Sequence, residues 1–262
     1  FVLWFTKSKF QDQDVKWNSP WGEGYPGWHI ECSAMAIKYL GNHFDIHMGG
    51  EDLAYIHHNN EIAQSESSTG IEPWVNYWLH SAFLINKDAL KMSKSEGNIT
   101  TLENLNENGY SAIDYRYLTL GTHYRKQLIF SKEGLDSAKN ARSKLNQFVL
   151  KIKTKPLKID EGEAYLTQFS DSLNDDFNTA KALSVLSKLM KDTRLYNGEK
   201  YSLILKFDEV FGLGLSDLGK NIPNRIIKLA EEREKLRALK QYDASDDVRI
   251  KIEKQGYTLI DE

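Results

Sequence analysis

A lysine-containing loop offers the clearest chemistry in the sequence. It consists of Lys91, Met92, Ser93, Lys94 and Ser95. Its two ammonium groups can bind one polyphosphate, and the serine hydroxyls and backbone N–H groups add further donors. Such donors stabilise the negative charge that develops on a departing pyrophosphate. A solvent-exposed basic turn is the alternative, but the full five-residue pattern, with Gly97 and Asn98 after it, favours the catalytic interpretation.

Three residues further upstream have side chains that bind zinc. Cys32 offers sulfur, His57 nitrogen and Glu61 oxygen. Because His57 and Glu61 are four residues apart, they share one face if this segment is a helix. Three protein ligands would leave one coordination position open, as in catalytic zinc sites. The alternative is a buried free cysteine, a histidine at a helix start and a surface glutamate. Spacing alone favours this alternative, because the separation of Cys32 and His57 is not that of a zinc finger.

Aromatic and acidic residues near two glycines could line a small ligand pocket. Gly49 and Gly50 allow a ligand to approach the backbone closely at the end of a strand. Trp28 and His47 could wall such a pocket, and Asp52 could accept a hydrogen bond from a ligand ammonium group. A core aromatic at Trp28 and a helix N-cap at Asp52 are the alternatives, and these residues alone do not decide between the two interpretations.

The elements that must position these residues alternate between strand and helix over residues 1–100. A short buried strand is expected at 45–48, a helix at 57–68 that ends at Gly70, and a strand at 77–84. This alternation favours a parallel α/β sheet.

After about residue 101 the pattern becomes helical. Apolar residues recur at helical spacing, and two linkers interrupt them, at 153–160 and 212–219. Helices are expected at 131–153, 163–172, 178–196, 201–211 and 223–240. The expected fold class is therefore α/β plus all-α.

Composition narrows the class of protein. Of 262 residues, 40% are hydrophobic and 27% are charged, which is ordinary for a globular protein and excludes a disordered one. The sequence has no apolar run of the roughly 18 residues that a membrane span requires. Cys32 is the one cysteine, so an internal disulfide is excluded and a cytoplasmic location is expected. Because the sequence begins at Phe1 within an apolar stretch, we expect further sequence upstream of it.

Taken together, the motifs resemble one family. The matching segments are 26–35 (PGWHIECSAM), 45–53 (DIHMGGEDL), 57–65 (HHNNEIAQS), 91–95 (KMSKS), 122–125 (THYR), 229–234 (LAEERE) and 246–249 (DDVR). The chain resembles the cysteinyl-tRNA synthetases, which are class I aminoacyl-tRNA synthetases, over nearly its whole length.

This resemblance implies an organisation into four regions. Residues 1–100 would form the C-terminal half of a Rossmann-type nucleotide-binding catalytic domain. Residues 101–130 would form a connecting stem-contact region. A tRNA-binding helical bundle would span 131–217, and a small C-terminal anticodon-binding region would span 218–262. Residues 131–158 carry eight Lys and Arg residues that could meet tRNA phosphates.

The resemblance also implies the chemistry. Cysteine would react with ATP, with Mg²⁺ present, to give cysteinyl adenylate and pyrophosphate, and the adenylate would acylate tRNA(Cys). The expected roles are Zn²⁺ binding by Cys32, His57 and Glu61, cysteine binding by Trp28, His47 and Asp52, ATP binding by 91–95, and catalysis by Lys91 and Lys94. A monomer is expected.

The family's HIGH-type ATP motif and fourth zinc ligand do not occur in these residues, so we expect residues 1–262 alone to be inactive. Two other functions stay open. One is a related ligase that joins cysteine to an amino-sugar, against which the tail at 223–262 argues. The other is a tRNA-binding fragment without catalytic activity.

Overall fold

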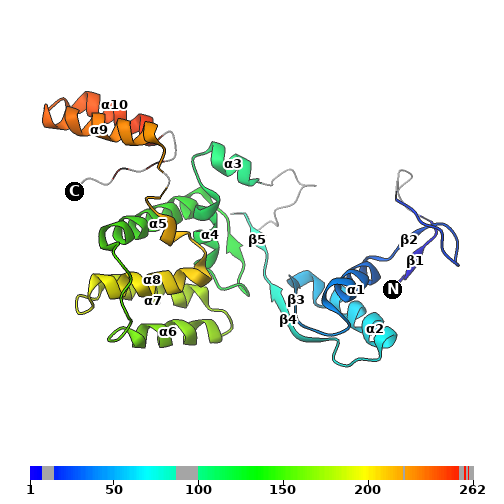
Figure 1. Cartoon of the computed structure of the whole chain (residues 1–262). Coiled ribbons are helices and arrows are strands. Elements are labelled where there is room, and N and C mark those ends of the chain that lie inside the picture. Colours follow the sequence, from blue (N-terminus) through cyan, green and yellow to red (C-terminus); the bar gives the residue numbers. More distant parts are fainter. Residues whose placement is uncertain (8–14, 87–99, 221, 254–256, 258, 260–262) are drawn as a thin grey trace. The chain divides into compact units, whose positions relative to one another are not determined.

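The computed structural model describes the chain except for residues 8–14, 87–99, 221, 254–256, 258 and 260–262 (Figure 1). The lysine loop at 91–95 therefore lies outside the described residues. The chain divides into two compact units. The first unit comprises Phe1–Leu84 and Tyr124–Leu128, and the second comprises Ile85–His123 and Ile129–Glu262.

The first unit is built around a parallel strand pair with helices beside it. Strand β3 (Phe44–Gly50) pairs in parallel with β4 (Val75–Ser81), in a register that runs from Phe44 opposite Val75 to Gly50 opposite Ser81. The connection between them contains η1 (Glu51–Leu53) and helix α2 (His57–Thr69). Helix α1 (Trp28–Leu40) precedes β3 and packs against α2. The parallel pairing expected from the alternation of strand and helix is confirmed.

Two further sheets are small. Strand β1 (Trp4–Phe5) pairs antiparallel with β2 (Tyr25–Pro26). Strands β5 (Leu84–Ile85) and β6 (Leu128–Ile129) form the other two-stranded sheet.

The strand at 45–48 was expected to be buried, and this expectation is wrong. Phe44 is buried, but Ile46 is 50% exposed and Met48 is 62% exposed. The reason is that only one face of the strand pair is packed. Phe44 contributes to a cluster with Trp74 and Val75, and Ile37 of α1 lies against that cluster.

The strand expected at 77–84 is also divided. Strand β4 ends at Ser81, and the following backbone pairs with a different segment. The N–H of Ala82 donates to the carbonyl of Tyr124 at 2.8 Å, and the N–H of Leu128 donates to the carbonyl of Phe83 at 3.1 Å. A run of apolar residues does not show such a change of partner.

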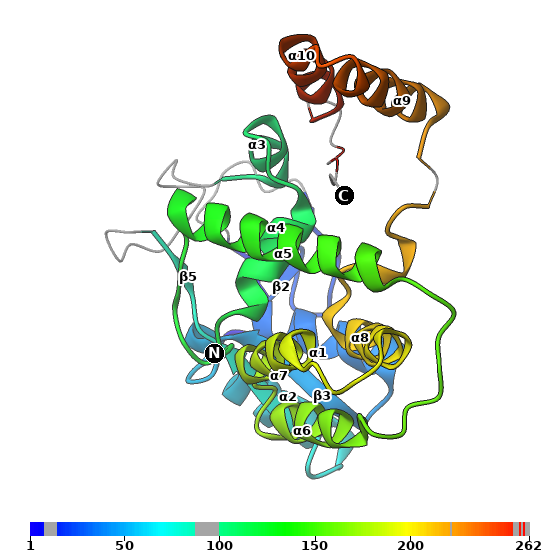
Figure 2. The same cartoon turned by 90° about the vertical axis from the view of Figure 1, so that its left-hand side faces the viewer.

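The second unit is helical (Figure 2). Its elements are α3 (Leu102–Glu107), α4 (Ala112–Leu120), α5 (Lys132–Ile152), α6 (Glu163–Asn174), α7 (Thr179–Lys191), α8 (Asn197–Phe211), η2 (Leu215–Asp217), α9 (Asn224–Ala238) and α10 (Tyr242–Glu253). The five expected helices are confirmed, with α7 ending earlier and α8 beginning earlier than expected. Among the described residues, none of the helices combines the length and apolar character that crossing a membrane requires.

Local capping explains helices that periodicity did not indicate. Thr101 and Asn104 form a reciprocal capping box at the start of α3, and Ser111 and Asp114 form another at the start of α4. The segment 101–130, expected only as a connecting region, therefore contains two helices.

A glycine in the first turn of α8 lies close to the preceding linker. A Cβ at Gly198 would come within 2.6 Å of the Leu157 side chain, so a larger residue there would displace this leucine.

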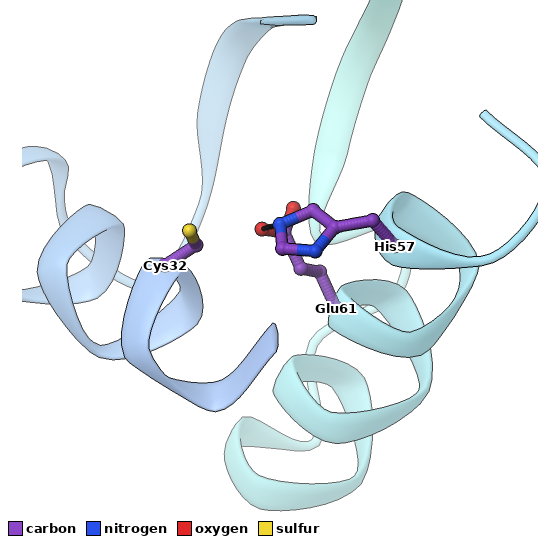
Figure 3. A group of neighbouring side chains, drawn as sticks. All are labelled: Cys32, His57 and Glu61. Atoms are coloured by element: carbon purple, nitrogen blue, oxygen red, sulfur yellow. Dashed lines mark ion pairs between the residues drawn. The ribbon is translucent and has the colours of Figure 1, made fainter. Parts of the chain in front are cut away.

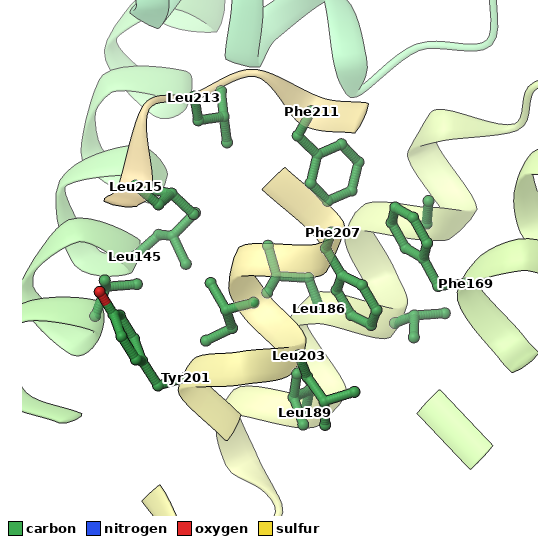
Figure 4. Packing of buried hydrophobic residues seen from close by; sticks show 14 of the residues in the cluster. Leu145, Phe169, Leu186, Leu189, Tyr201, Leu203, Phe207, Phe211, Leu213 and Leu215 are labelled. Atoms are coloured by element: carbon green, nitrogen blue, oxygen red, sulfur yellow. The ribbon is translucent and has the colours of Figure 1, made fainter. Parts of the chain in front are cut away.

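The largest core of the described chain lies between α5, α6, α7 and α8 (Figure 4). The rings of Phe169 and Phe207 stack with centroids 4.1 Å apart, and Phe211 meets Phe169 edge-on at 5.3 Å. A buried carboxylate ties the preceding linker to this core, because Glu199 accepts hydrogen bonds from the N–H groups of Asp160 and Gly162. Helices α9 and α10 pack against each other through a separate cluster.

We predict that Phe207→Ala lowers the free energy of unfolding of the second unit by about 3–5 kcal/mol, because it removes a fully buried ring and leaves a cavity. Chemical denaturation followed by far-UV circular dichroism measures this value. Val210→Ala, on the same helix but 46% exposed, is the control. Equal effects of the two substitutions would contradict this packing.

A pH-dependent prediction follows from Asp114. Burial opposes its ionisation, but the hydrogen bonds from Arg142, at 2.6 Å, and Ser111 outweigh this and lower the pKa of the Asp114 carboxyl. A lowered pKa adds stability above the ordinary pKa, and this stability is lost as the pH falls through the folded value.

Asp114→Asn should therefore cost about 1–3 kcal/mol at neutral pH. The difference from wild type should shrink below about pH 4. Urea denaturation at a series of pH values tests this, and a difference that stays constant down to acidic pH would disprove it.

Candidate metal centre

Glycines shape the end of α2 and the approach of β3 to this helix. Helix α2 ends at Gly70, which has the expected left-handed conformation with φ 69°. Gly49 in β3 lies directly beside His58 of α2, because a Cβ at Gly49 would come within 2.7 Å of the imidazole ring. Gly49 was expected to let a ligand approach the backbone, but in the structure the space beside it is occupied by the His58 ring.

The three expected metal ligands lie together in the first unit. The Sγ of Cys32, a nitrogen of His57 and a carboxylate oxygen of Glu61 all lie within 4.8 Å of one another. Figure 3 shows Cys32 on one helix and His57 and Glu61 on the other, with their side chains directed toward one another. His57 is 4% exposed and Glu61 is fully buried. The structure thus brings together a thiol, an imidazole and a carboxylate that are distant in sequence.

Glu61 contacts a different imidazole through each carboxylate oxygen. Its Oε1 lies 2.8 Å from Nε2 of His57, and its Oε2 lies 2.8 Å from Nε2 of His47. His47, Glu61 and His58 form a second group whose possible ligand atoms lie within 4.8 Å of one another. His47, expected to wall the substrate pocket, is therefore also a direct partner of an expected metal ligand.

Trp28 lies against the same group. Its ring centroid is 4.2 Å from that of His57, and the side chain is 60% exposed. Trp28 is therefore not a core aromatic. Asp52 lies within η1, whose N-cap is Gly50, and Ile56 occupies the N-cap of α2. Asp52 therefore caps neither helix, and it lies two residues after the strand that carries His47.

The surroundings shift the pKa values of the buried groups. Burial and the nearby Glu61 carboxylate raise the pKa of the Cys32 thiol to about 11. Burial also opposes ionisation of Glu61, but the hydrogen bond from His47 and the neighbouring imidazoles outweigh it and lower the pKa of this carboxyl. Burial lowers the pKa of His58 to about 4. At neutral pH the Cys32 thiol is therefore protonated, the Glu61 carboxyl is ionised and the His58 imidazole is neutral. A cation that binds the Cys32 sulfur must displace the thiol proton.

Two contacts between histidines were not predicted from the sequence. Nδ1 of His29 lies 2.8 Å from Nδ1 of His57, and Nδ1 of His58 lies 2.8 Å from Nε2 of His80. The spacing of His29 and Cys32 could have indicated the first contact, because residues three apart on a helix share a face. The expected ATP-binding residues at 91–95 lie outside the described part of the chain.

Comparison with known proteins adds independent findings. Residues 1–140 match the family model described as the tRNA synthetases class I (C) catalytic domain. Residues 168–216 match the DALR domain. The crystal structure of a ternary LeuRS-tRNA-LeuAMS complex from Agrobacterium radiobacter K84 has a similar fold, with a TM-score of 0.56 and 13% identity, over 79% of this chain and 34% of that one.

Three curated relatives carry the same name. A cysteine–tRNA ligase of Treponema denticola is 41% identical over all of this chain and 60% of its own length. Those of Brachyspira hyodysenteriae and Borreliella afzelii are 41% and 38% identical and are covered over 59% and 58% of their lengths. The chain thus spans about three fifths of the length of these relatives. Because the catalytic-domain model matches more than half of the residues, the chain belongs to the family of class I (C) tRNA synthetase catalytic domains.

Proposed function

We propose that the chain is part of a cysteine–tRNA ligase, which activates cysteine with ATP and transfers it to tRNA(Cys). The observation that carries this proposal is the group formed by Cys32, His57 and Glu61, in a chain whose relatives bear that name. We further propose that β3, α2 and β4 belong to the second half of a Rossmann-type nucleotide-binding fold. Their parallel pairing and crossover helix support this assignment.

The proposed cofactor is Zn²⁺, held by Cys32, His57 and Glu61. The donor set suits it, because sulfur, imidazole nitrogen and carboxylate oxygen are the usual zinc ligands. The Oε1 atom of Glu61 is fully buried, and its contact in the described structure is the imidazole of His57. A cation bound there would compensate this buried carboxylate. When bound, zinc supplies a thiophilic Lewis acid that distinguishes the cysteine thiol from the hydroxyl of serine.

The chain's own residues would orient cysteine beside this site. Trp28 packs on the His57 ring and would cover the substrate from one side. His47 would fix the Glu61 carboxylate through their 2.8 Å contact and contribute to the pocket wall. The Asp52 carboxylate would accept hydrogen bonds from the substrate ammonium. This orientation would leave the cysteine carboxylate available to attack the α-phosphorus of ATP.

The lysine loop would act on the leaving group. Residues 91–95 would bind the ATP phosphates together with Mg²⁺, and Lys91 and Lys94 would stabilise the charge on the departing pyrophosphate. The tRNA 2′-hydroxyl would then attack the adenylate carbonyl.

Helices of the second unit would contact the tRNA. Part of the basic character of residues 131–158 is used within the fold, because Arg142 pairs with Asp114, Lys139 donates to the carbonyl of Gly109, and Lys153 donates to that of Leu218. The remaining candidates for phosphate contact are Lys132, Lys144, Lys151, Lys155 and Lys158. We propose that the protein acts as a monomer in the cytoplasm.

Metal content tests the cofactor. We predict about one bound zinc ion per wild-type chain. Cys32→Ser should lose most of this zinc, because a hydroxyl is a poor zinc ligand. Elemental analysis after dialysis measures both values, with Lys38→Ser on the same helix as the control. Zinc retained equally by Cys32→Ser, or absent from the wild type, would contradict the proposal.

A kinetic experiment tests the lysine loop. In protein active in pyrophosphate exchange, Lys94→Ala should slow adenylate formation by about 10²–10³-fold, because it removes a charge that acts mainly in the transition state. Pre-steady-state kinetics should show a cysteine KM near that of wild type, and Lys38→Ala should behave as wild type. If Lys94→Ala raised the cysteine KM and left the rate unchanged, the assigned role would be wrong.

A further inference from the structure

A cavity in the second unit is lined by polar groups to which the proposed function assigns no role. It has a volume of about 300 Å³ and lies against α6 and the end of α7, which pack on each other. Gln168 of α6 and Lys188 of α7 line it, together with Glu161 from the segment before α6 and Arg194 from the segment after α7. Among the described residues, no hydrogen bond or ion pair engages the side chains of Glu161, Gln168 and Lys188. Three free polar side chains therefore converge on one cavity, as they do in ligand sites.

The guanidinium of Arg194 is held in one orientation although its side chain is 83% exposed. Its Nε donates to Oδ1 of Asp192 at 3.0 Å, and its Nη2 donates to Oδ2 at 2.6 Å. The Asp192 carboxylate is itself fixed, because its side chain is 6% exposed and the Tyr165 hydroxyl donates to it at 2.9 Å. The remaining N–H groups of Arg194 have no partner among the described residues, so they are available to a ligand. Such an arginine binds an oxyanion with less loss of side-chain entropy than a freely moving one.

The charges of the cavity suit a ligand that is anionic in one part and donates a hydrogen bond from another. Asp192 balances the charge of Arg194, so Lys188 supplies a positive charge without a partner in the described structure. Glu161 supplies an acceptor that is equally free. A ribose-phosphate unit of RNA has both features, because its phosphodiester is anionic and its 2′-hydroxyl can donate. A volume of about 300 Å³, at the lower end of the range of ligand sites, suits a group of this size.

We propose that this cavity binds one ribose-phosphate unit of the tRNA backbone, with the phosphate on Arg194 and Lys188 and the 2′-hydroxyl donating to Glu161. This inference rests on the proposed function, in which the second unit contacts tRNA. The cavity is a site separate from the lysines of residues 131–158, because α6, α7 and the segments beside them form it. Contacts to phosphate and sugar carry no direct information about the base, so the site positions the RNA and does not select its sequence.

The affinity for tRNA(Cys), measured by filter binding at a series of salt concentrations, tests the phosphate contact. Lys188→Gln should weaken binding by about 10-fold, because it removes a charged hydrogen-bond donor. The plot of log affinity against log salt concentration should also become shallower by about one, since one phosphate contact is lost. Arg194→Lys keeps the charge but lacks the planar fork, so it should weaken binding as well. Lys191→Gln is the matched control, because Lys191 is exposed on the same helix and does not line the cavity.

Equal tRNA affinities and equal salt slopes for Lys188→Gln and Lys191→Gln would overturn the inference. The phosphate could also come from a free anion, which a titration with inorganic phosphate followed by ³¹P NMR distinguishes. If Lys188→Gln weakened binding of inorganic phosphate and left tRNA binding unchanged, the assignment to RNA would be wrong.

The contact with the 2′-hydroxyl is tested with tRNA(Cys) that carries 2′-deoxynucleotides at random positions. Sequencing the bound and unbound fractions identifies the positions at which loss of the hydroxyl weakens binding to the wild-type protein. At least one such position should lose its effect in Glu161→Ala, because the acceptor is absent there. An identical set of sensitive positions in both proteins would contradict the role of Glu161. If the wild-type protein bound no tRNA at all, the proposed function itself would fail, which is a different and recognisable result.

Discussion

The candidate site depends on one buried carboxylate with an imidazole at each oxygen. Glu61 is fully buried, and its two oxygens each lie 2.8 Å from a histidine nitrogen. A buried anion without partners is costly, so these contacts are what allow a carboxylate to occupy the interface of α1 and α2. The same contacts fix the direction of Oε1 toward His57 and Cys32. Without these contacts, the Glu61 carboxylate would not be held where it can share one cation with Cys32 and His57.

The surrounding fold supplies the conditions for this interaction. The parallel pairing of β3 and β4 places His47 on the strand beside α2, and the absence of a side chain at Gly49 leaves room for His58. Helix packing then brings Cys32 of α1 to the other side of the carboxylate. The helical second unit has its own apolar core and its own polar anchors, such as Asp114 and Glu199. The first unit thus holds the candidate site, and the second unit is a helical domain with a core of its own.

Some of this organisation could be predicted from the sequence. The four-residue spacing of His57 and Glu61 put both on one helix face, and the regular apolar spacing after residue 131 indicated the helices of the second unit. The position of Cys32 relative to that face depends on how α1 packs on α2, which spacing in sequence does not express. The burial of β3 was misjudged because the alternation of Ile46 and Met48 with polar residues does not show which face of the strand is covered. The three-residue spacing of His29 and Cys32 puts both on one face of α1, but the contact of His29 with His57 also depends on how the two helices pack. The proposed ATP-binding role of residues 91–95 rests on their sequence motif alone, because they lie outside the described residues.

Zinc K-edge X-ray absorption of the zinc-loaded protein tests the central claim most directly. The account predicts sulfur scattering at about 2.3 Å from Cys32, with nitrogen or oxygen ligands at about 2.0–2.2 Å. Addition of cysteine should increase the sulfur contribution by about one ligand, whereas addition of serine should leave it unchanged. A spectrum without sulfur, or one that responds in the same way to both amino acids, would contradict the assignment of this site to thiol recognition.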